Sequence, residues 1–173
     1  MDKIAVLKKY FGYTSFRPGQ EVLIDALLQG QDVLGIMPTG AGKSLCYQVP
    51  ALLFPGITLV ISPLISLMQD QVQALETAGI KAAYINSALS GREFYTTLEQ
   101  ARAGAYKMIY VAPERLETEL FRDFAKEADI SMVAVDEAHC ISQWGQDFRP
   151  SYTRILDFLE FQKSRSSQKI PFS

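Results

Sequence analysis

Thr39-Gly40-Ala41-Gly42-Lys43-Ser44 separates two apolar segments of this 173-residue chain, residues 32–36 and residues 45–54. The first segment is rich in β-branched and aliphatic residues, so we expect a buried strand. The second is longer and begins directly after the Lys-Ser pair, so we expect a helix. A glycine-rich turn between a strand and a helix is the layout of a triphosphate-binding loop.

Glycines at such a turn allow backbone N–H groups to surround phosphate oxygens. Lys43 would place its charge on the β- and γ-phosphates, and the Ser44 hydroxyl would ligate Mg²⁺. We expect the backbone of Thr39, Gly40 and Gly42 to complete the loop. The general pattern has a further glycine where this chain has Met37. An ordinary glycine turn beside a surface lysine is therefore the alternative.

Two adjacent carboxylates, Asp136 and Glu137, follow a second apolar run at residues 132–135. Carboxylates at the end of a buried strand are costly to bury unless a cation pairs with them. We expect Asp136 to hold Mg²⁺ and Glu137 to orient or deprotonate the water that attacks the γ-phosphate. A helix N-terminus also favours carboxylates and is the alternative, but the phosphate loop favours the metal interpretation.

Helical and strand patterns alternate along the chain, which predicts an α/β fold with a mainly parallel sheet covered by helices on both faces. Ligands of such sheets bind at the carboxyl ends of the strands, where both motifs are expected. We expect one domain over residues 1–161 and a polar, disordered tail over residues 162–173. The remaining predicted helices are 2–10, 20–28, 65–78, 90–102, 116–128 and 151–161, and the remaining strands are 57–61, 82–85, 107–111 and 132–135.

The formal net charge of −2 shows no global basic bias, so any nucleic-acid contact is expected to be local. Cys46 and Cys140 make neither a disulfide framework nor a zinc site. No signal peptide or membrane span is evident, and no membrane partner is expected. These features favour a reducing compartment, which would be the bacterial cytoplasm near the nucleoid, or the nucleus in a eukaryote.

Five motifs together resemble RecQ-type DNA helicases, in order and with matching spacing, between residues 7 and 152. The family's fold is a RecA-like P-loop domain. The motifs resemble, in chain order, the adenine-recognition motif, motif I, motif Ia, a later DNA-side motif, and motif II with the aromatic-rich loop that follows it: residues 11–20, 37–51, 62–71, 113–116 and 136–145.

The resemblance implies an adenine site at the first motif. Tyr13 would stack on the base, and Gln20, with Arg17 beside it, would read the adenine edge and exclude guanine. Taken alone, the Phe-Arg-Pro-Gly sequence at residues 16–19 is more typical of a turn before a helix.

The resemblance also implies contacts with single-stranded DNA and coupling of those contacts to ATP. Aromatic faces stack on unpaired bases, and arginine pairs with phosphate. From composition alone, packing in the core would be the more usual role for the lone tryptophan. A glutamine, Gln146, stands where the family usually has histidine, which would weaken coupling. The implied DNA-binding or coupling residues are Ser62, His139, Gln143, Trp144, Phe148 and Arg149.

The family's Ser-Ala-Thr motif and second RecA-like lobe do not occur in this sequence. We therefore expect an incomplete lobe whose missing partner is the second helicase lobe. An arginine finger contributes about 10³–10⁵ in rate in related enzymes, so the chain alone should bind ATP weakly and hydrolyse it slowly at best, and it should not unwind DNA. A non-catalytic module that binds ATP or a partner is the main alternative. A small-molecule kinase is less favoured, because no acceptor pocket is evident.

Overall fold

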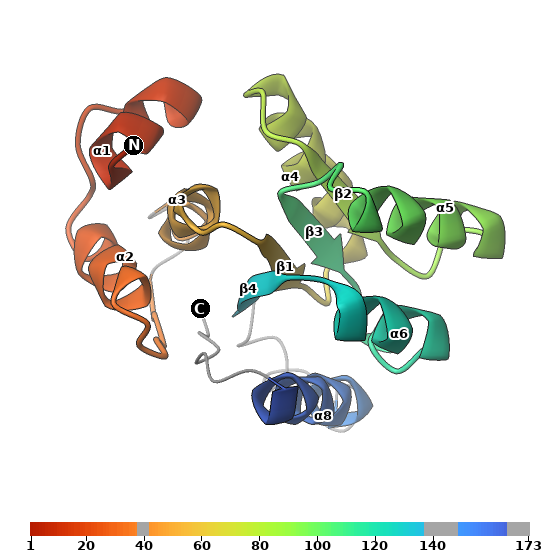
Figure 1. Cartoon of the computed structure of the whole chain (residues 1–173). Helices are drawn as coiled ribbons and strands as arrows, with labels where there is room; N and C mark the ends of the chain where they lie inside the picture. Colours follow the sequence, from red (N-terminus) through yellow and green to blue (C-terminus); the bar gives the residue numbers. More distant parts are fainter. Residues whose placement is uncertain (38–41, 137–148, 166–173) are drawn as a thin grey trace.

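A parallel four-stranded sheet forms the centre of the computed structural model, which describes residues 1–37, 42–136 and 149–165. The strand order is β2-β3-β1-β4, and every neighbouring pair is parallel (Figure 1). The strands are β1 (Ile57–Ile61), β2 (Ala82–Ile85), β3 (Met108–Val111) and β4 (Ile130–Val135). The helices are α1 (Lys3–Val6), α2 (Gln20–Leu28), α3 (Leu45–Leu53), α4 (Ile65–Thr77), α5 (Gly91–Arg102), α6 (Glu119–Glu127) and α8 (Arg149–Arg165), with a π-helical turn at Leu7–Phe11 and a 3₁₀ turn at Pro113–Arg115.

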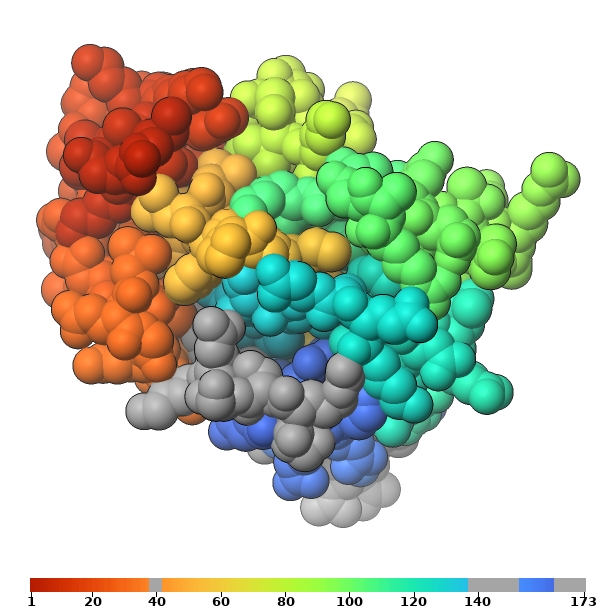
Figure 2. All heavy atoms as spheres, in the orientation of Figure 1, coloured from red at the N-terminus to blue at the C-terminus, as the bar shows by residue number. Residues whose placement is uncertain are grey.

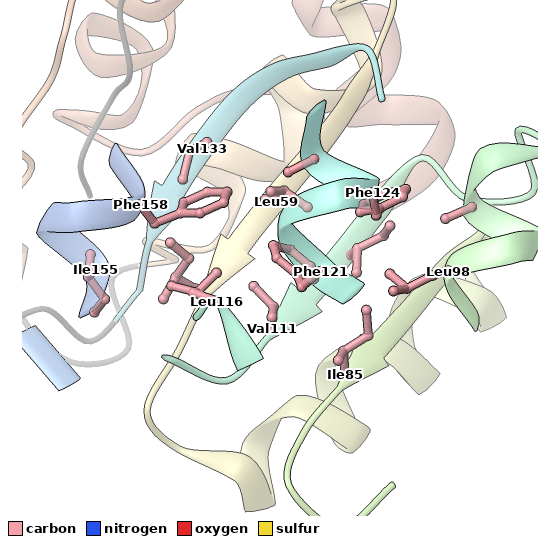
Figure 3. Close-up of a cluster of buried hydrophobic side chains, with 14 of the residues drawn as sticks. Leu59, Ile85, Leu98, Val111, Leu116, Phe121, Phe124, Val133, Ile155 and Phe158 are labelled. Atoms are coloured by element: carbon pink, nitrogen blue, oxygen red, sulfur yellow. The ribbon is translucent and has the colours of Figure 1, made fainter. Parts of the chain in front are cut away.

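Each face of the sheet is covered by its own set of helices, because successive side chains of a strand point to opposite faces. On β1, Leu59 and Ile61 join one hydrophobic cluster with α5, α6 and α8, whereas Val60 joins a second cluster with α3 and α4. Figure 3 shows the first cluster, in which Phe121 and Phe158 lie between the helices and the strands. The predicted α/β architecture with two covered faces is confirmed.

A small third cluster attaches the N-terminal helices to the rest of the domain. Val6 and Leu7 are buried against Ile24 of α2 and Val49 of α3. Figure 2 shows this N-terminal part, red to orange, on the opposite side of the molecule from α5 in green. The adenine-recognition motif therefore lies beside the helix that follows the phosphate loop.

Helix boundaries follow local capping signals. Ser90 accepts a hydrogen bond from the Glu93 backbone, and the Glu93 side chain accepts one from the Ser90 backbone, so α5 begins with a capping box. The predicted helix at 116–128 is wrong in its first turn. The hydroxyl of Thr118 caps α6, so that helix begins at Glu119 after the separate 3₁₀ turn.

The predicted strand at residues 32–36 is also wrong, because residues 31–37 form neither helix nor strand. Leu34 is 70% exposed and Ile36 is 89% exposed. A strand needs a hydrogen-bonded neighbour, and the strands in the described ranges pair only with one another. An apolar sequence alone does not supply that neighbour.

Helix α8 is longer than the predicted helix at 151–161. It continues to Arg165, four residues into the segment predicted as a tail. Gln162 is buried, and Phe158 beside it packs into the core. The predicted end of the helix at residue 161 is therefore wrong. The domain boundary and the disordered tail stay predictions, and residues 166–173 lie outside the described residues. Every helix of the described ranges is too short or too polar to span a bilayer.

Candidate nucleotide site

Three strands end side by side at one edge of the sheet, and the residues after them form the candidate site. The Asp136 N–H donates to the Ile61 carbonyl at 2.8 Å, and the Ser62 N–H donates to the Val111 carbonyl at 3.2 Å. Both hydrogen bonds extend the parallel ladder by one residue. Asp136 and Ser62 are therefore held at the carboxyl ends of β4 and β1, where ligands of α/β sheets bind.

A cavity of about 230 Å³ opens at this edge. It brings the end of the phosphate loop and the first residue of the acidic pair into one site, although they are far apart in sequence. The loop provides an ammonium group and a hydroxyl, and β4 provides a carboxylate. The lining residues are Gly42, Lys43, Ser44, Ser62, Leu67, Met68, Gln71, Tyr110 and Asp136.

This donor set is suitable for magnesium and phosphate. Mg²⁺ prefers oxygen ligands and is commonly bound by one or two protein groups together with substrate phosphates. The Ser44 hydroxyl and the Asp136 carboxylate supply those oxygens, and Lys43 supplies charge for the phosphates. The described ranges contain no group of three or more His, Cys, Asp or Glu side chains that could hold a metal ion. A metal site formed by protein ligands alone is therefore absent from these ranges.

A larger cavity of about 730 Å³ lies at the opposite, amino edge of the sheet. Ile57, Lys81, Lys107 and Asp129, at or directly before the four strand starts, line it. The Lys107 ammonium donates to the carbonyls of Phe54 and Gly56. The Lys107 ammonium is thus already hydrogen-bonded to backbone carbonyls, and the phosphate loop and the acidic pair lie at the other edge of the sheet. The smaller cavity is therefore the candidate nucleotide site.

Gly42 links the phosphate loop to the adenine-recognition motif. The Gln20 side chain donates through Nε2 to the Gly42 carbonyl at 2.9 Å and accepts from the Arg17 N–H at 2.8 Å. Gln20 is buried, with 1% of its surface exposed. Gln20 is thus oriented by the two motifs that it connects.

Replacing Gly42 by alanine should weaken nucleotide binding. Gly42 has φ +73°, and a Cβ there would lie 2.6 Å from Gln20 Nε2. The left-handed backbone costs an L-residue about 1–2 kcal/mol. Alanine therefore favours a relaxed loop, and re-forming the phosphate-binding conformation would cost up to about 5- to 30-fold in affinity. Calorimetric titration with a Mg-ATP analogue measures this loss. Gly91→Ala is the matched control, because nothing lies within 4 Å of a Cβ at that position. Equal affinities in the two variants would contradict the prediction.

Tyr13 and Arg17 lie in the loop before α2, and both are exposed. Tyr13 is 52% exposed, so its ring face is accessible for stacking. Gly12 and Gly19 at the two ends of this loop have positive φ angles of 76° and 88°. The loop therefore presents Tyr13 and Arg17 to solvent while the buried Gln20 anchors its end. Their adenine roles stay predictions.

A buried polar cluster beneath the cavity was not anticipated from the sequence. The Tyr47 hydroxyl donates to Asp136 Oδ2 at 2.9 Å and lies 3.4 Å from the Tyr110 hydroxyl. Burial raises the pKa of Tyr110 to about 12 and the pKa of Tyr47 well above its ordinary value. Both hydroxyls are therefore protonated at neutral pH and can donate. The only sequence signal was Gln48, a polar residue inside an apolar helix.

Ser62 and Arg115 belong to two motifs that resemble DNA-binding motifs of the RecQ-type helicases. In this structure both side chains make hydrogen bonds within the protein. Ser62 is buried, lines the nucleotide cavity and accepts from the Leu64 N–H at 3.3 Å. Arg115 donates to the carbonyls of Asn86 and Leu89 at 3.0 and 2.8 Å. Its guanidinium also lies 4.6 Å from the centre of the Phe94 ring. Arg115 thus ties the loop after β2 to α5 and to the 3₁₀ turn, and a DNA contact of Ser62 stays a prediction.

We expect Arg115→Met to destabilise the domain by about 1–3 kcal/mol, because two partly buried carbonyls would lose their donor. Urea unfolding followed by circular dichroism measures the change. Arg92→Met on the exposed surface of α5 is the control and should stay within about 0.5 kcal/mol of the parent. If Arg115→Met unfolds like the parent and loses only DNA binding, the residue contacts DNA and is not a structural clamp.

Most of the predicted DNA-binding and coupling residues lie outside the described residues, as do several nucleotide-binding residues. The backbone of Arg149 begins α8, and nothing is described of its side chain. The predicted site residues outside the described ranges are Thr39, Gly40, Glu137, His139, Gln143, Trp144 and Phe148.

Comparison with known proteins identifies the family of this chain. The family model described as DEAD/DEAH box helicase matches residues 17–173. The chain is 57% identical over 152 residues to the ATP-dependent DNA helicase RecQ of Bacillus subtilis, covering 87% of this chain and 26% of that protein. It is 52% identical over 152 residues to RecQ of Haemophilus influenzae, covering 88% and 25%. The chain thus spans about a quarter of the length of the curated relatives it matches.

Solved structures share the fold. A hypothetical ATP-dependent RNA helicase from Sulfolobus tokodaii superposes with a TM-score of 0.73 at 22% identity, covering 98% of this chain and 49% of that one. The DUF1998 helicase MrfA bound to DNA superposes with a TM-score of 0.78 at 18% identity, covering 99% and 26%. At these identities the likeness concerns the fold, which is that of helicase domains.

Proposed function

The chain belongs to the DEAD/DEAH box helicase family, and from its similarity to the N-terminal helicase lobe of RecQ proteins we propose that it is the ATP-binding lobe of a DNA helicase. In the whole protein this lobe would couple ATP hydrolysis to 3′-to-5′ unwinding. One observation carries the proposal most directly. The cavity at the carboxyl edge of the sheet joins Lys43 and Ser44 of the phosphate loop to Asp136.

Three residues of this cavity have roles that their chemistry supports. Lys43 places its charge on the β- and γ-phosphates, while Ser44 and Asp136 provide oxygens for Mg²⁺. When bound, Mg²⁺ neutralises the charge that develops on the phosphates. Glu137 follows Asp136 directly and would orient or deprotonate the attacking water. Tyr13, Arg17 and Gln20 would select adenine over guanine.

Single-stranded DNA is the proposed second ligand, contacted by Trp144, Phe148 and Arg149, with His139 and Gln143 coupling DNA to the acidic pair. This lobe would act together with a second helicase lobe. Without that lobe we expect weak ATP binding, slow hydrolysis and no unwinding, because no arginine finger completes the site. We also propose an intracellular, reducing location, because Cys46 and Cys140 make no disulfide framework.

Calorimetric titration of the purified chain tests the nucleotide assignment. We expect saturable binding of a Mg-ATP analogue and weaker binding of the matched guanine analogue. No binding by a chain that still shows a cooperative thermal transition would contradict the assignment. Steady-state ATPase assays with and without single-stranded DNA then separate an enzyme from a non-catalytic binding module, since only an enzyme lobe shows stimulated turnover.

A further inference from the structure

Four residues form a hydrogen-bonded group directly behind Asp136, on the sheet face covered by α3 and α4. Tyr47 and Gln48 come from α3, Gln71 from α4 and Tyr110 from β3. The Gln48 Nε2 group donates to the Tyr110 hydroxyl at 3.2 Å and lies 3.3 Å from Gln71 Oε1. The Tyr110 hydroxyl donates to Gln71 Oε1 at 3.1 Å.

The hydroxyls of this group are not required by packing. The two tyrosine rings lie in a cluster whose other buried members are non-aromatic and apolar, with Val60, Met68 and Ala134 among them. Phenylalanine would fill the same volume, whereas a buried hydroxyl costs free energy unless it is hydrogen-bonded. The retained polar group therefore suggests a function that an apolar core cannot supply.

The position of this hydrogen-bonded group beside the nucleotide cavity indicates what the polar side chains do. Asp136, Tyr110 and Gln71 line the nucleotide cavity, but Tyr47 does not. Tyr47 is 1% exposed, and its hydroxyl reaches Asp136 Oδ2 from within the protein at 2.9 Å. One carboxylate oxygen is thus held from behind while the carboxylate as a whole borders the cavity.

We propose that Tyr47 is a positioning residue for magnesium binding: its hydroxyl fixes the orientation in which the Asp136 carboxylate borders the cavity and meets the ion or its water. Tyr110, which is held by Gln48 and Gln71, lies beside the Tyr47 hydroxyl at 3.4 Å and links this group to α4. This inference rests on the proposed function, because it concerns the same site. Partners that orient a metal ligand commonly contribute about 10- to 100-fold to metal affinity.

The test is Tyr47→Phe, which keeps the ring and removes only the hydroxyl. The Mg²⁺ concentration that half-saturates binding of an ATP analogue should rise about 10- to 100-fold, while the thermal midpoint changes by only a few degrees. Tyr106→Phe is the matched control. Its hydroxyl donates to Gln100 at 2.5 Å, next to the amino end of β3, so its removal should leave the magnesium dependence unchanged.

A double-mutant cycle separates positioning from a general loss of structure. In the Asp136→Asn background, Tyr47→Phe should cause no further change in the half-saturating magnesium concentration, because Tyr47 acts through that carboxylate. Additive losses, or a magnesium dependence of Tyr47→Phe equal to that of the parent, would overturn the inference.

Failure of the proposed function would give a different result. If the parent binds no nucleotide, the ATP-binding assignment fails, and Mn²⁺ alone becomes the probe. Water proton relaxation measures its binding directly. A loss of Mn²⁺ affinity of about tenfold in Tyr47→Phe, but not in Tyr106→Phe, would still support the positioning role, and equal affinity in both variants would reject it.

Discussion

Lys43→Ala is expected to weaken binding of a Mg-ATP analogue by about 10- to 100-fold, with the fold intact. Lys43 lines the same cavity as Asp136 and is the ammonium group expected to contact the β- and γ-phosphates. Interactions with charged groups contribute about 1.5–3 kcal/mol, which gives that range of affinity. Calorimetry measures the binding, and a thermal melt at the parent's midpoint shows that the domain still folds.

Lys81→Ala is the control for this prediction. Lys81 is an exposed lysine directly before β2, at the opposite edge of the sheet. It changes the net charge by the same amount as Lys43→Ala but should leave affinity unaltered. If the parent binds nucleotide and both variants bind equally well, the nucleotide is held elsewhere and the phosphate-loop assignment is wrong.

Elements that depend on local signals could be predicted from the sequence. Strands β1 and β2 have the predicted bounds, Ile57–Ile61 and Ala82–Ile85, because short apolar runs there are bounded by turn residues. Helix α2 likewise begins at Gln20, directly after Gly19 with its positive φ, as predicted. The meeting of the phosphate loop with Asp136 also followed from the rule for parallel sheets.

Features that depend on distant partners could not be predicted in the same way. Residues 32–36 have a strand-like composition, but pairing requires a second chain segment, and Leu34 and Ile36 are exposed. Tyr47 and Tyr110 have the pattern of ordinary core residues. Only the packing of α3 against β3 and the end of β4 shows that the Tyr47 hydroxyl reaches Asp136, with the Tyr110 hydroxyl 3.4 Å from that of Tyr47. Sequence spacing contains no information on that convergence.

Phe121→Ala is expected to lower the free energy of unfolding by about 3–5 kcal/mol, a large share of the 5–15 kcal/mol typical of a domain. Phe121 is fully buried, and its ring centre lies 5.7 Å from those of both Phe124 and Phe158. The ring therefore joins α6 to α8 above the sheet, and its removal would leave a cavity shared by both helices (Figure 3).

Urea unfolding of the parent and of Phe121→Ala measures the difference. Tyr95→Ala on α5 is the control, since it removes an aromatic ring that is 51% exposed and should cost about 0.5 kcal/mol or less. Because α8 packs on this cluster through Ile155, Phe158 and Leu159, hydrogen exchange in α8 should accelerate in Phe121→Ala as well. Unchanged exchange in α8 together with a small loss of stability would show that the two helices are held independently.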